Sequence, residues 1–71
     1  MKYAIIIEKG ETSFGAYVPD LPGCVAVADT EAEVMDLIHE AIEFHLEGLR
    51  DEGSSIPMPR SNVGFVEVRA F

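Results

Sequence analysis

The chain contains few of the residues that staple a small fold or anchor it in a membrane. Cys24 is the single cysteine, so neither an intrachain disulfide nor a cysteine-based zinc site can form. A domain this small without disulfides suits a reducing compartment, and we expect the cytoplasm. The longest aliphatic run, residues 4–7, is far shorter than the roughly 20 apolar residues of a membrane span. No signal-peptide pattern precedes it, so no membrane association is expected.

Basic residues are scarce as well. The chain has 5 Lys and Arg against 13 Asp and Glu, which gives a formal net charge of −8. Nucleic-acid binding needs a basic surface that displaces counterions from phosphates, so direct nucleic-acid binding is not expected. The acidic balance favours solubility or a basic protein partner.

The 71 residues allow one domain, 1–71, of the α+β class. Apolar runs bounded by turn residues predict strands at 2–8, 13–18, 24–28 and, near the end of the chain, 61–68. The first two should form an antiparallel hairpin across the turn at 9–12, and a proline-rich loop separates them from the third. A domain of this size is marginally stable unless it is stapled or oligomeric.

One helix is predicted between the third and fourth strands. Thr30 and Glu33 form a capping box at its start, and apolar residues then recur at three- and four-residue spacing to about Glu52. Gly53 stands where a C-terminal cap is expected. Gly48 should cost about 0.5–1 kcal/mol of helix stability unless something packs closely against it.

The two sides of this helix differ in chemistry. One side carries four carboxylates, at Asp36, Glu40, Glu43 and Glu47. The opposite apolar arc, from Phe44 round to Leu46, spans about 200°, whereas one core-facing stripe needs only about 100°. The arc is therefore either a broad core stripe or a stripe whose edge, at Met35 and Leu46, meets another chain.

Alternation along the strands adds to this surplus of apolar surface. In residues 2–8, Tyr3, Ile5 and Ile7 share one face, while Ala4 and Ile6 lie on the other. One helix covers only one face of the sheet, and exposed apolar patches usually mark interfaces. We therefore expect an obligate partner or a homo-oligomer, a dimer or a tetramer, with Ala4, Ile6, Met35 and Leu46 at its interface.

The sequence offers no constellation typical of an enzyme. His39 and His45 lie about 240° apart on the helix, so they cannot ligate one metal together. His45, near the centre of the apolar arc, is expected to be a hydrogen-bonded buried or interface residue. The acidic side of the helix lacks the partner carboxylate that two-metal nuclease chemistry requires. Cys24 has no neighbouring base, and no phosphate-binding loop is present, so we expect no catalysis, metal or cofactor.

Several segments resemble the HicB-like antitoxin family of bacterial toxin–antitoxin systems. The segments are 17–24 (Tyr-Val-Pro-Asp-Leu-Pro-Gly-Cys), 29–33, 40–42, 46–49 and 56–59 (Ile-Pro-Met-Pro), and the likeness extends from Lys2 to about Val68. The resemblance implies a partly degraded ribonuclease-H-like domain with the element order β-β-β-α-β, in which the first three strands are antiparallel and the helix lies on one face. In such a domain the fourth strand lies parallel beside the first, as a right-handed crossover requires.

The resemblance also implies a function. Family members neutralise a small basic toxin of the HicA type, which cleaves mRNA, by covering its RNA site. Many carry a C-terminal DNA-binding segment, and here we expect none, because the chain ends at Phe71 directly after the fourth predicted strand.

Six residues are candidate contacts to the toxin. They are Tyr17, Asp20, Leu21, Glu40, Glu43 and Glu47. Asp20 and Leu21 have an alternative role, as a turn residue and a core anchor. A different functional hypothesis also stands: a self-associating regulatory or small-ligand-binding module that has no toxin partner.

Overall fold

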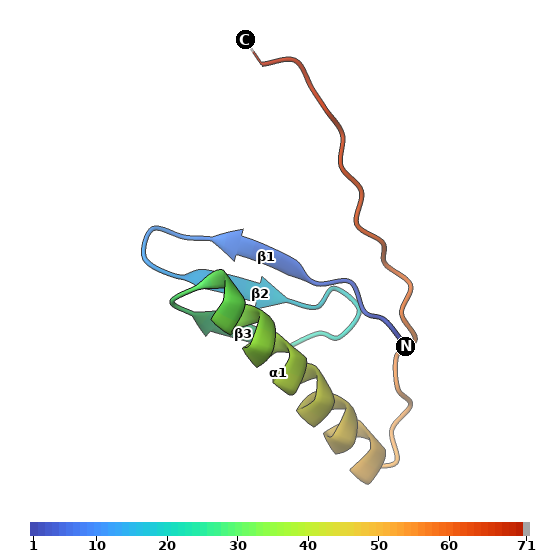
Figure 1. The fold of residues 1–71 in the computed structure, drawn as a ribbon. Coiled ribbons are helices and arrows are strands. Elements are labelled where there is room, and N and C mark those ends of the chain that lie inside the picture. Colours follow the sequence, from blue (N-terminus) through green and yellow to red (C-terminus); the bar gives the residue numbers. More distant parts are fainter. Residues whose placement is uncertain (71) are drawn as a thin grey trace.

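The computed structural model describes residues 1–70 of the chain, and Phe71 lies outside them. Three short strands, β1 (Ile6–Lys9), β2 (Phe14–Tyr17) and β3 (Val25–Ala28), are followed by one helix, α1 (Glu31–Asp51). The strands form one antiparallel sheet in the order β1-β2-β3. The helix lies across one face of the sheet (Figure 1). This α+β arrangement confirms the first three predicted strands and the helix, with the strands shorter than predicted.

Both ends of α1 are capped by the residues that the sequence indicated. The backbone N–H of Glu33 donates to the Thr30 hydroxyl oxygen at 3.1 Å, and that hydroxyl donates to the Glu33 carboxylate at 2.9 Å. At the other end Gly53 adopts φ +73°, and the N–H of Ser54 reaches back to the carbonyl of Leu49 at 2.9 Å. This is the left-handed terminal turn that glycine makes at the lowest cost.

The core lies between α1 and the helix-facing side of the sheet. Two buried residues come from α1, Val34 and Ile38, and they pack against buried residues of β2 and of the loop that joins β2 to β3. The remaining buried side chains are Ala16, Val18, Leu21 and Cys24. The helix packs mainly on β3 and β2, so the β1 side of the sheet is the less covered.

The two faces of β1 divide as the alternation predicted. Tyr3, Ile5 and Ile7 pack against the core beneath α1. Ile6 lies on the opposite face, where it is paired with Tyr17 of β2. No element covers that face within residues 1–70, so an apolar sheet surface faces solvent.

Two helical residues depart from the predicted apolar arc. Leu37 is 42% exposed, and Phe44, which the arc placed at one edge, is 79% exposed. The predicted arc is broader than the stripe of α1 that is buried in one chain, because the sheet beneath α1 is only three strands wide.

The fourth strand predicted at 61–68 is not present in the described residues of the single chain. Within the part of the chain that the structure describes, no residue after α1 pairs with the sheet. Residues 61–70, which we call the arm, instead run away from the body in an extended conformation (Figure 1). The radius of gyration is 14.2 Å, against about 11 Å for a compact chain of this length. The alternation of residues in the arm is typical of a strand, but a strand also needs a neighbouring strand with which to pair.

No helix within residues 1–70 combines the length and the apolar character that crossing a membrane requires.

Candidate partner-binding surfaces

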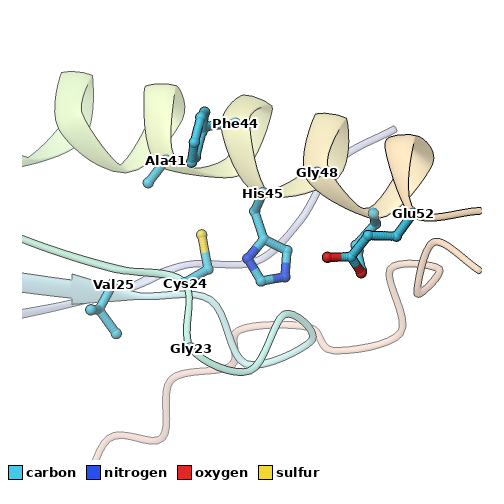
Figure 2. Close-up of a pocket in the computed structure, with 9 residues that line it drawn as sticks. Gly23, Cys24, Val25, Ala41, Phe44, His45, Gly48 and Glu52 are labelled. Carbon is cyan, nitrogen blue, oxygen red and sulfur yellow. The ribbon is translucent and has the colours of Figure 1, made fainter. Parts of the chain in front are cut away.

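A groove lies between α1 and the start of β3, and we call it the β3 groove (Figure 2). Its volume is about 420 Å³. Its walls come from the loop before β3 and from the second half of α1. The lining residues are Gly23, Cys24, Val25, Ala41, Phe44, His45, Gly48, Leu49 and Glu52. Most of this lining is apolar, which suits an apolar side chain of a partner.

The polar groups of the β3 groove are few. Figure 2 shows His45 pointing from α1 into the groove, between Cys24 and Glu52. Half-buried His45 therefore lies in a groove rather than in the sealed core, which matches the interface alternative for this residue. Burial raises the pKa of the Cys24 thiol, which keeps it protonated and unreactive at neutral pH. Gly48 has open space where a side chain would stand, so no packing within the chain accounts for this glycine.

A second groove, the β1 groove, lies on the other side of α1. Its volume is about 370 Å³, and α1 and the extended residues before β1 line it. The lining residues are Met1, Tyr3, Ile5, Met35, Ile38, His39, Ile42, Glu43 and Leu46. Met35 and Leu46, two of the predicted oligomer contacts, therefore lie together in one groove. Ala4 and Ile6, the other two, belong to the opposite face of β1.

The acidic strip, which we define as Asp36, Glu40, Glu43 and Glu47, is exposed along α1. Its spacing keeps the four carboxylates on one side of the helix, as predicted. Glu43 lies 3.9 Å from His39, but both side chains are at least 70% exposed, so this pair adds little stability. The strip thus presents negative charge to solvent with no basic side chain of α1 within it.

Tyr17 lies on the sheet face that α1 leaves open. It is 41% exposed and stands between Ile6 of β1 and Val25 of β3 in the same row of the sheet. Val27 of β3 is also exposed on this face. Tyr17 is therefore accessible to a partner, together with a neighbouring apolar patch.

Leu21 lies in the core and not at the surface. It is 0% exposed and packs in the core, so a direct toxin contact at Leu21 is ruled out in this conformation. The reason is the loop between β2 and β3, which folds inward: the N–H of Leu21 donates to the carbonyl of Val18, and the N–H of Cys24 donates to the carbonyl of Leu21. The alternative role, a core anchor, is the one that the structure supports.

Asp20 holds the start of the arm. One carboxylate oxygen accepts the N–H groups of Arg60 at 2.8 Å and Ser61 at 2.9 Å, and the other accepts the Ser61 hydroxyl at 2.7 Å. These donors, the Arg60 N–H first, hold the pKa of Asp20 below its usual 3.8. The contact could not be found from sequence, because 40 residues separate the partners.

We expect this clamp to open in acid. The folded pKa of Asp20 is lowered, so its stabilising contribution is complete above pH 3.8 and is lost as the pH falls through the lower folded value. The NMR amide shifts of Arg60 and Ser61 should titrate together below pH 3.8, while amides within α1 far from carboxylates do not follow them. In Asp20→Asn these two amides should lose that step. A midpoint at or above 3.8 would contradict the assignment.

No group of three or more His, Cys, Asp or Glu side chains within residues 1–70 is arranged to hold a metal ion. His39 lines the β1 groove and His45 the β3 groove, so the two imidazoles lie on different sides of α1, as their spacing predicted.

Phe44 and the exposed valines of β3 were not among the predicted contacts. The signal for the valines was available: Val-Ala-Val-Ala at 25–28 places both valines on one face of a strand. Phe44 gave no such signal, because its exposure depends on the width of the sheet beneath α1.

Comparison with known proteins identifies relatives of this chain. The family model described as HicB_like antitoxin of bacterial toxin-antitoxin system matches residues 3–69. A UPF0150 protein of Thermoplasma acidophilum is 38% identical over 71 residues, 99% of this chain and 100% of that protein. An uncharacterised 14.9 kDa protein of Haemophilus phage HP1 is 42% identical over 57 residues, 80% of this chain. The match spans only 43% of the phage protein's length.

A solved structure is similar as well. A chain in the HicA3 and HicB3 toxin-antitoxin complex superposes with a TM-score of 0.72 and 35% sequence identity. The match covers 84% of this chain and 70% of that chain. At this identity the likeness extends from the fold to the sequence.

Proposed function

Because the chain belongs to the HicB-like antitoxin family of bacterial toxin–antitoxin systems, we propose that it neutralises a small basic toxin of the HicA type. Neutralisation is by occlusion: the chain covers the surface on which the toxin binds mRNA. The observation that carries this proposal is the similarity to a chain of a HicA3–HicB3 complex over 84% of this chain. The family supports an antitoxin role without catalysis, so the chain acts as a binding protein without a cofactor.

The contact surface in this proposal is acidic and lies on α1. Glu40, Glu43 and Glu47 are exposed, and the whole chain carries a net charge of −8, which suits a toxin whose RNA site is basic. Tyr17 adds an exposed aromatic side chain on the open face of the sheet. Asp20 contributes indirectly, by holding the arm, and Leu21 by anchoring the loop from the core.

The setting of this function is part of the same proposal. The chain acts in the cytoplasm, where mRNA is the toxin's substrate, and it acts as a homo-oligomer. A fourth strand beside β1, which a ribonuclease-H-like arrangement requires, forms in the assembled protein. Direct contact with nucleic acid is not part of the role, since the surface is acidic.

The test is co-expression with the short, basic, histidine-containing reading frame encoded beside this chain. The toxin alone should arrest growth and cleave RNA in vitro, and equimolar chain should restore growth and protect the RNA. A toxin variant without its catalytic histidine should still bind the chain, because occlusion requires no chemistry. If no such reading frame exists, or if its product neither binds nor is inhibited, the toxin-free module is the better description.

A further inference from the structure

The arm exposes more apolar surface than a free segment in water normally does. Phe65 is 94% exposed and Val66 is 86% exposed, and Val63 and Val68 are also exposed. All four lie within six residues of the arm, which runs away from the sheet and the helix (Figure 1). Exposed apolar side chains in such a run mark a surface that another polypeptide covers.

The arm has a strand pattern with one side that is apolar beyond Asn62. In an extended chain alternate residues point to opposite sides. After Asn62, this side carries only apolar residues, Gly64, Val66, Val68 and Ala70. The other side mixes apolar and charged residues, Val63, Phe65, Glu67 and Arg69. A strand of this kind buries its apolar side and leaves the mixed side at the surface.

The outer edge of β1 could pair with such a strand. The sheet order makes β1 an edge strand, so its outer backbone N–H and C=O groups have no strand partner among residues 1–70. The β1 groove opens beside this edge, between the residues before β1 and α1. A strand added to this edge would place its alternate side chains over the groove, against Met35 and Leu46.

The arm runs away from the β1 edge of its own copy. Asp20 fixes Arg60 and Ser61 to the body, and the Tyr3 hydroxyl donates to the carbonyl of Pro57. Pro57 and Pro59 restrict the residues before them to extended conformations, so the segment that leads into the arm is itself extended. The arm therefore leaves the body straight, and the long dimension of the chain reaches 51 Å.

We propose that two copies of this chain exchange arms. Each arm adds a fourth strand to the β1 edge of the second copy and buries Val66 and Val68 in that copy's β1 groove. The strand lies parallel to β1, as the fourth strand would if it belonged to the same copy. Exchange of this kind gives a closed twofold dimer, in which each copy fills the other's edge. The inference concerns self-association and does not depend on the binding of a toxin.

The first test compares two variants of the full chain with equal charge changes. Val66→Asp with Val68→Asp adds two negative charges on the apolar side of the arm, and Arg69→Asp changes the net charge by the same amount on the other side. In sedimentation equilibrium the native chain and Arg69→Asp should be dimers, whereas the double variant should dissociate at least about tenfold more readily. Its helical circular dichroism should persist, because Val66 and Val68 are largely exposed in the single chain, at 86% and 79%. A monomeric native chain, or a double variant as dimeric as the native chain, would overturn the proposal.

The second test distinguishes the exchange of arms between two copies from the folding of each arm onto the β1 edge of its own copy. In a Cys24→Ala background, one copy carries Met35→Cys in the β1 groove and another carries Val66→Cys in the arm. After co-expression and treatment with a short bismaleimide, the two copies should become linked into a species of twice the chain mass. A chain that carries both substitutions serves as the control. If cross-links form only within that chain, and none form between copies, then the arm folds onto its own β1 and the exchange is overturned.

Discussion

Reversal of charge at Glu40, Glu43 and Glu47 to lysine should slow association with the proposed HicA-type toxin by about tenfold or more at low salt. The acidic strip is exposed, so its charges act on the approaching toxin at long range rather than through buried contacts. The rate should also lose most of its dependence on salt, because screening then has less attraction to remove. Stopped-flow association at a series of ionic strengths measures both effects.

A matched variant controls for total charge. Reversal of Glu8, Glu11 and Asp29 changes the net charge from −8 to −2, as does reversal on the strip, because each substitution adds two charges. These three residues are also exposed, but they lie outside α1. The control should therefore keep most of the native association rate. Equal slowing by both variants would show that net charge, and not the strip, steers the toxin.

Leu21→Ala should destabilise the chain by about 2–5 kcal/mol, the range for truncating a fully buried leucine. Leu21 is 0% exposed and contributes to a core of only six buried residues, so little material can collapse into the cavity. Small domains have a total stability of about 5–15 kcal/mol, so this loss removes a large fraction of the free energy of unfolding. Urea unfolding followed by circular dichroism at 222 nm gives the change in midpoint.

Leu37→Ala is the matched control, because it removes the same atoms from a side chain that is 42% exposed. The alanine also has a slightly higher helix propensity, so the change should cost less than about 1 kcal/mol. Similar losses at both positions would mean that the loop before β3 is not a structural anchor. A loss confined to Leu21 would confirm that this loop, despite its turn-like sequence, belongs to the core.

The local features of the fold were predictable because they depend on neighbouring residues. The Thr30–Glu33 capping box, the turn at Gly53 and the alternation along β1 each involve residues within a few positions of one another. The fourth strand was not predictable in the same way. Its pattern was correct for a strand, but whether a strand forms depends on a partner edge that the sequence does not name.

The candidate surfaces were predictable to a similar extent. Helical spacing placed Glu40, Glu43 and Glu47 together, and it separated His39 from His45. It could not divide the broad apolar arc into a buried stripe and two grooves, since that division depends on the width of the sheet beneath α1. Nor could it find the clamp at Asp20, whose donors at Arg60 and Ser61 come from a distant segment.

The single thiol of the chain gives the β3 groove a chemical reporter. Cys24 is buried at the floor of this groove, and burial raises its pKa, so a thiol reagent can modify it only when the loop before β3 opens. The labelling rate of the native chain at neutral pH therefore measures how often that opening occurs. A ligand seated over Phe44 and Gly48 would slow this rate without any engineered label, so occupancy of the groove can be followed in the unmodified protein.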